Sequence, residues 1–278
     1  MFEGEAGDLR PIHPAAMAFV GDTSPAGRLL ETAVGAWKMS ALGVALGAEV
    51  VVVNTGGLVR GPYGRRLKLA KADLIRPSLV IVLERGAELE HLAQALEGRG
   101  FAVVRLSVAA EVRAKRPEER RRWRELRFQA YFAGAGVVEL ETSCLMISGR
   151  SLGGGPRLSE EECDGLQAEL GVPILYGERQ GEEVYAVAAE PPAGALPAQV
   201  RLAPASSFRR LLCGLIDRQG VCLALGLVED WSRERLRVLT PLAAQRTAEV
   251  VALEVGELAL DEQLREWRPT IPWARPVP

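Results

Sequence analysis

The stretch EVVVVNTGGLVRGPYGRRLKLAKADLIRPSLVIVLE, from Glu49 to Glu84, decides the fold of this chain. Four valines end abruptly in Asn54-Thr55-Gly56-Gly57, a basic amphipathic segment follows over 65–75, and a second apolar run covers 79–83. A β-branched run, a polar loop, a helical pattern and another β-branched run are typical of a strand–helix–strand unit in a parallel sheet. The sequence therefore predicts such a unit here.

Asn54 and Thr55 directly follow the first predicted strand, at its carboxyl end. Ligands of open α/β sheets bind beyond the carboxyl ends of the strands, so this loop is a candidate wall of a binding site. The alternative is a helix-entry loop whose Asn and Thr side chains only cap backbone groups. The pattern alone does not decide between the two interpretations.

A second loop of the same kind lies upstream, where the apolar run 16–20 ends in Gly21-Asp22-Thr23-Ser24-Pro25. Thr23 or Ser24 suits a helix N-cap, and Pro25 suits the first helical position. We expect a helix from Ala26 to about Leu46. Alternation then continues with strands at 49–54, 78–84 and 101–106 and helices at 65–75 and 87–97, which predicts a three-layer α/β domain.

The segment RAKRPEERRRWRELRFQAYF, residues 113–132, is the most basic in the chain, with eight basic and three acidic residues between Arg113 and Arg127. Pro117 can begin a helix on which Arg120, Arg124 and Arg127 share one face. The segment is either a solvated surface helix or a phosphate-binding arm, because arginine makes forked contacts to phosphate.

The pattern of predicted helices and strands changes after Gly136. We expect a strand over 137–147, a flexible joint at Gly149–Pro156 and a helix over 157–170, followed by short strands at 182–189, 198–203, 208–216, 220–228, 234–240 and 247–260. This predicts an α/β domain over residues 1–148 and a β-rich domain over residues 149–278. The proline-rich tail TIPWARPVP is expected to be loose.

Composition excludes several classes of protein. The net charge of −2 gives no overall attraction to nucleic acid. The four cysteines form no CxxC pair and there are only two histidines, so we expect no metal site and buried free thiols. No apolar run approaches the roughly 18 residues of a membrane span, and the first residues lack a signal-peptide core. The expected location is the cytoplasm, without a membrane partner.

Several segments, in this order, resemble the family of RNA and DNA 5′-hydroxyl kinases that includes the kinase subunit of the pre-mRNA cleavage factor. In the first half they are 19–25 (FVGDTSP), 53–61 (VNTGGLVRG), 75–83 (Ile75-Arg76-Pro77 to Leu83) and 116–134 (Arg116 to Gly134). In the second half they are 212–217 (LCGLID), 226–230 (GLVED) and 236–241 (LRVLTP). The resemblance covers about residues 16–262.

This resemblance implies a transferase that moves the γ-phosphoryl group of ATP, with magnesium, to the 5′-hydroxyl end of RNA or DNA. It implies that the basic helix over 113–132 is a lid. The catalytic candidates are Arg120, Arg116 and Lys115, and the substrate-binding candidates are Thr23, Ser24, Asn54, Thr55 and Arg124. Leu58 stands where eukaryotic relatives carry a stacking tryptophan, which removes a base contact worth roughly 1–3 kcal/mol.

One departure from the family pattern is larger. No Gly-x-x-x-x-Gly-Lys-Ser/Thr motif precedes the Thr-Ser-Pro turn in residues 1–20, so the chain lacks the loop that surrounds ATP phosphates with backbone N–H groups. The expected fold is thus an incomplete P-loop-kinase-like parallel sheet with helices on both faces, followed by a smaller β-rich domain. The missing strand leaves two unpaired sheet edges unless another segment fills the gap.

Two functions stay open at this point. The chain is a truncated or split portion of a polynucleotide 5′-hydroxyl kinase that does not bind ATP alone, with a separate chain as a candidate source of the missing P-loop portion. Alternatively, it is a non-catalytic nucleic-acid-binding or scaffold protein that retains the kinase fold. A small-molecule enzyme on a doubly wound sheet is a weaker third interpretation, because no acid–base pair stands out.

Overall fold

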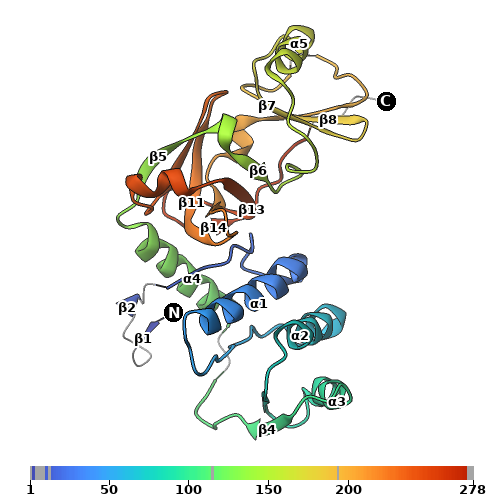
Figure 1. Cartoon of the computed structure of the whole chain (residues 1–278), viewed down its shortest axis with the longest axis vertical. Coiled ribbons are helices and arrows are strands. Elements are labelled where there is room, and N and C mark those ends of the chain that lie inside the picture. Colours follow the sequence, from blue (N-terminus) through green and yellow to red (C-terminus); the bar gives the residue numbers. More distant parts are fainter. Residues whose placement is uncertain (1, 4–9, 12–13, 114–115, 193, 274–278) are drawn as a thin grey trace. The chain divides into compact units, whose positions relative to one another are not determined.

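The computed structural model describes residues 2–3, 10–11, 14–113, 116–192 and 194–273. The chain packs as two compact units (Figure 1). The helical unit is Asp22–Arg122, and the β-rich unit combines Met1–Gly21 with Trp123–Pro278. The division at residue 148 expected from the sequence stays a prediction about domains.

The helical unit alternates helices and strands. Its elements are the 3₁₀ helix η1 (Pro25–Gly27), α1 (Leu29–Ala45), α2 (Gly61–Ile75), β3 (Val80–Glu84), α3 (Glu90–Glu97) and β4 (Val103–Ser107). Helix α4 (Pro117–Phe132) begins in this unit and continues into the β-rich unit. The predicted order of helix, strand, helix and strand from α2 to β4 is confirmed.

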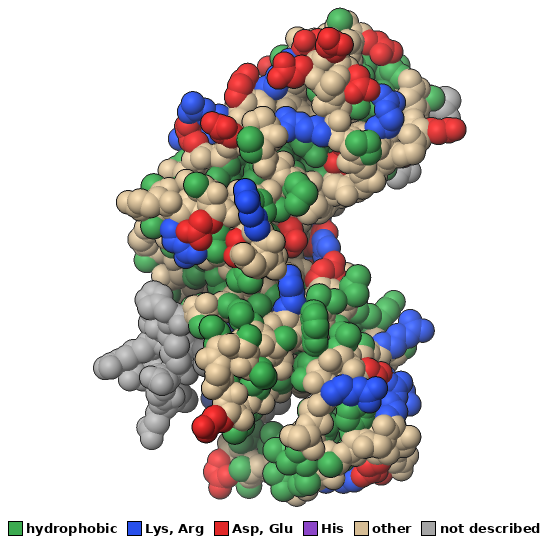
Figure 2. Space-filling model, in the orientation of Figure 1, with side chains coloured by type: hydrophobic (Ala, Val, Ile, Leu, Met, Phe, Trp, Pro, Cys, Tyr) green, Lys and Arg blue, Asp and Glu red, His purple; other side chains and the backbone are tan. Residues whose placement is uncertain are grey.

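Strands β3 and β4 form a two-stranded parallel sheet whose two faces differ. One face packs on α2 and α3, where Leu69, Ala72 and Leu96 contact Val80 and Val103. The other face carries four apolar side chains that stay exposed among the described residues, Ile81, Leu83, Val104 and Leu106. Hydrophobic side chains lie at the surface next to β4 in Figure 2. We call these four residues the open sheet face.

The strand expected at residues 49–54 is not formed in the structure, which corrects that prediction. Residues 50–53 pair with no described strand, and Val52 is 86% exposed. A strand needs a neighbour to accept and donate its ladder hydrogen bonds, and no described segment supplies one. The expected strand at 16–20 is likewise reduced to one antiparallel bridge between Met17 and Cys222.

The β-rich unit contains a seven-stranded sheet in the order β14-β13-β10-β11-β12-β5, with β6 paired in parallel to β13. Its strands are β5 (Gly136–Glu141), β6 (Met146–Ser148), β10 (Leu211–Ile216), β11 (Cys222–Trp231), β12 (Arg235–Thr240), β13 (Ala252–Leu260) and β14 (Glu266–Trp267). A three-stranded sheet has the order β7-β8-β9, made of Ile174–Gln180, Glu183–Ala188 and Val200–Pro204. The mixed α/β architecture with a parallel sheet and a β-rich part is therefore confirmed.

The remaining elements join these sheets. They are β1 (Phe2–Glu3), β2 (Arg10–Pro11), η2 (Thr142–Cys144), α5 (Glu160–Leu170), η3 (Ala205–Phe208) and η4 (Ala244–Glu249). Helix α5 begins with a capping box in which the Ser159 hydroxyl and the Glu162 carboxylate each accept a backbone N–H of the other residue. The single strand expected over 137–147 is split by η2 into β5 and β6.

The core of the β-rich unit is aromatic and aliphatic. Trp231 is buried and packs edge-on against Phe208 and at a tilt against Tyr176. Ile271 is buried and Trp273 packs against Phe208 and Tyr185, so the tail is ordered as far as Trp273. The expectation of a loose tail was wrong for these residues.

The glycine segment Gly149–Pro156 is also ordered, contrary to the expected flexible joint. The carboxylate of Glu178 is fully buried and accepts hydrogen bonds from the backbone N–H groups of Gly153 at 2.8 Å and Gly154 at 2.9 Å. The Tyr176 hydroxyl donates to the same carboxylate at 3.1 Å. Because a buried carboxylate requires such donors, the loop is fixed to β7.

All four cysteines are free; Cys163, Cys213 and Cys222 are buried and Cys144 is exposed. Burial raises the pKa of the Cys222 thiol to about 12. Within the described part of the chain, none of the helices combines the length and apolar character that crossing a bilayer requires.

Candidate nucleic-acid-binding site

The Thr23–Ser24 turn is organised by one carboxylate. Asp22 accepts a hydrogen bond from the Ser24 backbone N–H at 3.0 Å and one from the Thr23 hydroxyl at 3.4 Å. Ser24 is the N-cap of η1 and Pro25 occupies its first turn, as predicted. The helix nevertheless begins in two steps, because η1 ends at Gly27 and α1 starts at Leu29. Thr23 and Ser24 remain exposed.

The Asn54–Gly57 loop is exposed and lies along helix α2. The Lys68 ammonium group donates a hydrogen bond to the carbonyl oxygen of Gly56 at 2.6 Å. Gly64 packs so closely on the next part of the loop that a Cβ there would lie 2.7 Å from the carbonyl carbon of Val59. The loop is therefore held by α2 while its polar side chains face solvent.

The first turn of α4 presents basic side chains at the surface. Pro117, Glu118 and Glu119 open the helix as predicted, and the Glu119 carboxylate accepts the Arg116 backbone N–H at 2.8 Å. Arg116 and Arg120 are exposed. The third catalytic candidate, Lys115, lies outside the described residues.

Arg124 lies further along α4 and forms a forked ion pair with Glu266 in the β-rich unit. Its Nε donates to the carboxylate at 2.8 Å, and a second guanidinium nitrogen donates to the other oxygen. Its proposed contact with substrate stays a prediction.

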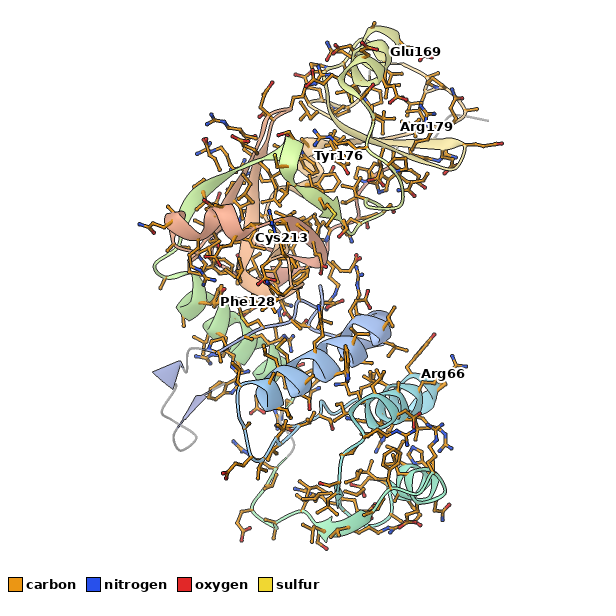
Figure 3. The ribbon with its side chains drawn as sticks, in the orientation of Figure 1. Arg66, Phe128, Glu169, Tyr176, Arg179 and Cys213 are labelled. Atoms are coloured by element: carbon orange, nitrogen blue, oxygen red, sulfur yellow. The ribbon has the colours of Figure 1, made fainter. Side chains whose placement is uncertain are left out.

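The last turns of α4 are also fixed within the β-rich unit. The Tyr131 hydroxyl accepts the Leu225 backbone N–H at 2.8 Å, and burial raises the pKa of Tyr131 to about 12. Phe132 is buried in a cluster with Leu212, Leu227 and Leu258, and Phe128 packs against it (Figure 3). These contacts anchor the helix from Arg124 onward.

The predicted site residues therefore divide between the two units. Thr23, Ser24, Asn54, Thr55, Arg116 and Arg120 belong to the helical unit, and Arg124 belongs to the β-rich unit. Their convergence on one cleft stays a prediction. Sequence reasoning missed Lys68, although its spacing of four residues from Gly64 places it on the helix face that meets the loop.

The described residues do not fit the phosphates of ATP. The glycine-rich segment with closely spaced N–H groups is Gly153–Gly155, and the Glu178 carboxylate already accepts two of these N–H groups. No group of three or more His, Cys, Asp or Glu side chains among the described residues could hold a metal ion. We therefore derive no step of phosphoryl transfer through ATP or magnesium from these residues.

An α/β unit with an incomplete parallel sheet and polar loops before its helices, joined to a β-rich unit, defines a P-loop-kinase-like class of protein. The sequence model described as the P-loop of the mRNA cleavage and polyadenylation factor CLP1 matches residues 6–134. A polyribonucleotide 5′-hydroxyl-kinase of Thermococcus kodakarensis is 32% identical over 243 residues, which is 86% of this chain and 68% of the relative. The chain belongs to the polynucleotide 5′-hydroxyl kinase family.

Two further relatives support this assignment. A polyribonucleotide 5′-hydroxyl-kinase of Pyrococcus furiosus is 29% identical over 240 residues, covering 84% of this chain and 66% of the relative. One of Methanocaldococcus jannaschii is 27% identical over 267 residues, covering 93% of this chain and 72% of the relative. The chain thus spans about two thirds of the length of the curated relatives it matches. The resemblance to this family predicted from the sequence is confirmed.

Proposed function

We propose that this chain is the polynucleotide-binding portion of a polynucleotide 5′-hydroxyl kinase, an enzyme that transfers the γ-phosphoryl group of ATP to a 5′-hydroxyl end. The observation that carries the proposal is the 32% identity to the Thermococcus kodakarensis kinase over 86% of the chain. These relatives are polyribonucleotide kinases by name, which favours RNA as the substrate. The four free thiols fit a reducing compartment, and we propose the cytoplasm.

The roles of the side chains follow from the chemistry of the reaction. Phosphoryl transfer depends mainly on positioning and on stabilising charge in the transition state, and arginines at the end of a helix can supply such charge. Arg120 and Arg116, with Lys115, are the proposed catalytic lid. The proposed substrate contacts are Thr23, Ser24, Asn54, Thr55 and Arg124.

ATP and magnesium are bound, in this proposal, by a P-loop portion outside residues 1–278, on a separate chain or elsewhere in the same polypeptide. The open sheet face supports this proposal, because parallel sheets are covered on both faces. Leu83 on the open sheet face is 59% exposed, whereas Val82 on the packed face is 6% exposed. Residues 50–53 likewise lack a neighbouring strand among the described residues.

Calorimetry with ATP and magnesium tests the first part of this proposal. We expect no heat of binding for residues 1–278 alone, and micromolar affinity would contradict the proposal. The second part is tested by producing the chain together with a Gly-x-x-x-x-Gly-Lys-Ser/Thr segment encoded in frame upstream or beside its gene. The assay follows labelled γ-phosphate from ATP to a 5′-hydroxyl RNA oligonucleotide.

In the completed enzyme Arg120→Ala should lower turnover about 100- to 1,000-fold, the usual effect of removing one charge-stabilising group. Arg122→Ala is the matched control, because it removes an exposed arginine two positions along the same helix and thus from its opposite side. Unchanged phosphorylation by Arg120→Ala would contradict the lid role. Salt-dependent RNA binding without any phosphoryl transfer would instead support a non-catalytic binding or scaffold protein.

A further inference from the structure

Helix α2 presents two lysines to the loop that it holds. Gly64, Lys68 and Lys71 stand at i, i+4 and i+7 and therefore share one helix face. Gly64 meets Val59, and Lys68 donates to the carbonyl oxygen of Gly56 at 2.6 Å. The loop thus runs back along this face, towards Lys71.

These two ammonium groups are half-buried and lack an acidic partner in the described part of the chain. Two arginines of the helical unit, by contrast, have acidic partners. Arg99 pairs with Asp73, and Arg105 pairs with Glu90 and Glu97. Burial, and then repulsion by Lys71, lower the pKa of Lys68 to about 8, and burial lowers the pKa of Lys71. Two like charges partly removed from water are an arrangement that an anion stabilises.

The loop beside the lysines offers hydrogen-bond donors. Asn54, Thr55, Gly56 and Gly57 are exposed, and no side-chain hydrogen bond joins Asn54 or Thr55 to another described residue. An amide N–H₂ and a hydroxyl in the loop that the Lys68 ammonium group contacts match the oxygens of a phosphate group. A carboxylate would use fewer of these donors, because it has two oxygens rather than three or four.

We propose that Lys68 and Lys71, together with the Asn54–Gly57 loop, form a subsite for a backbone phosphate of the polynucleotide near its 5′ end. The choice of a polynucleotide as the source of the phosphate rests on the function proposed above. The subsite adds two positive charges that position the chain of the substrate, and these charges are carried by α2. Inorganic phosphate and ATP share the phosphate chemistry and serve as competing probes.

The test measures binding of a 3′-labelled, 5′-hydroxyl RNA decamer to the full chain by fluorescence anisotropy at several salt concentrations. The double variant Lys68→Gln/Lys71→Gln should lose at least about tenfold in affinity at low salt. The slope of log affinity against log salt should become shallower by about 0.7, because one phosphate contact with single-stranded nucleic acid is lost and each contributes about 0.7. Lys68→Arg, which keeps the charge, should retain most of the affinity.

Arg66→Gln is the matched control. It removes one charge from the same helix, and Arg66 lies on the outer side of α2 (Figure 3). Its affinity for RNA should change less than twofold. Thermal unfolding of each variant checks that the fold is retained, which we expect because replacing the lysines removes their mutual repulsion.

Three results would overturn the proposal. They are an absence of RNA binding by the full chain, unchanged affinity and salt slope in the double variant, and an equal loss of affinity in Arg66→Gln. If ATP or inorganic phosphate binds in a lysine-dependent way while RNA does not, the polynucleotide assignment is wrong. A failure of the completed enzyme to transfer phosphate, with lysine-dependent RNA binding intact, would reject the proposed kinase function and leave the subsite standing.

Discussion

The guanidinium group of Arg124 and the carboxylate of Glu266 form a forked ion pair that fixes the middle of α4 to β14. The Glu266 side chain is 6% exposed and that of Arg124 is 34% exposed, so the carboxylate depends on this partner more than the guanidinium does. The pair separates the anchored part of the helix from the exposed basic turn at its start. The Arg124–Glu266 ion pair therefore restrains the helix that carries the proposed lid.

Arg124→Met should lower the free energy of unfolding by about 2 kcal/mol, less than the 3–5 kcal/mol of a fully buried pair because the arginine is partly exposed. Replacing both partners, as in Arg124→Met/Glu266→Leu, should recover most of this loss, since no charge is then left buried. Urea unfolding measures both effects. A loss of RNA affinity in the folded double variant would assign Arg124 a direct substrate contact as well.

Gly155 tests whether the glycine segment is fixed to β7. A Cβ at Gly155 would lie 1.8 Å from the carbonyl oxygen of Arg179, so Gly155→Ala must displace backbone and should cost about 3 kcal/mol. Gly165→Ala, in the middle of α5, meets no atom within 4 Å and should stabilise the chain by up to about 1 kcal/mol through helix propensity. Equal stability of the two variants in urea would contradict the close contact.

The open sheet face leads to a prediction about assembly rather than stability. Leu83→Lys should change the unfolding free energy of residues 1–278 by less than about 0.5 kcal/mol, because the side chain is already exposed. Val82→Ala, on the packed face, should cost about 2 kcal/mol. If a P-loop portion covers the open face, Leu83→Lys should abolish phosphoryl transfer by the completed enzyme. Full activity of Leu83→Lys would show that this face stays uncovered.

Local signals predicted the helices and most strands, because caps and periodic patterns act over a few residues. Ser24, Pro25 and Pro117 begin helical turns as expected from their side-chain chemistry. The valine run at 50–53 has the composition of a strand, yet strand formation also requires a neighbour that is distant in sequence. The composition of residues 50–53 could not show that no described segment pairs with them as a neighbouring strand.

Long-range pairing also explains the errors around Gly149–Pro156 and the tail. Glycine content predicted flexibility, whereas the buried carboxylate of Glu178, 24 residues away from Gly154, fixes the segment. The same holds for the site: the arginine pattern of α4 was visible in the sequence, but the partner of Arg124 lies 142 residues away. The contact between Lys68 and the loop was not predicted, because the charged side chains of a basic helix are ordinarily exposed to solvent.

The lowered pKa of Lys68 predicts a pH dependence of stability. Its pKa is about 8 in the folded chain against 10.5 as the reference for the unfolded chain. Between these values the unfolded chain binds more protons, so the contribution of Lys68 to the free energy of unfolding rises with pH. Below pH 8 the destabilisation by the half-buried charge is fully present, and near pH 10.5 it has been relieved.

Comparison of the native chain with Lys68→Met isolates this contribution, because other groups titrate in the same range. The lowered pKa of Lys71 acts in the same direction, whereas the raised pKa values of Cys222 and Tyr131 act in the opposite direction, and all three remain in both proteins. The native chain should gain stability relative to Lys68→Met as the pH rises from 8 to 10 in urea unfolding. Arg66→Met should show a constant difference from the native chain over this range, because a guanidinium group stays charged. A constant difference for Lys68→Met as well would mean that the Lys68 ammonium is fully hydrated, which would also remove the electrostatic basis of the phosphate subsite.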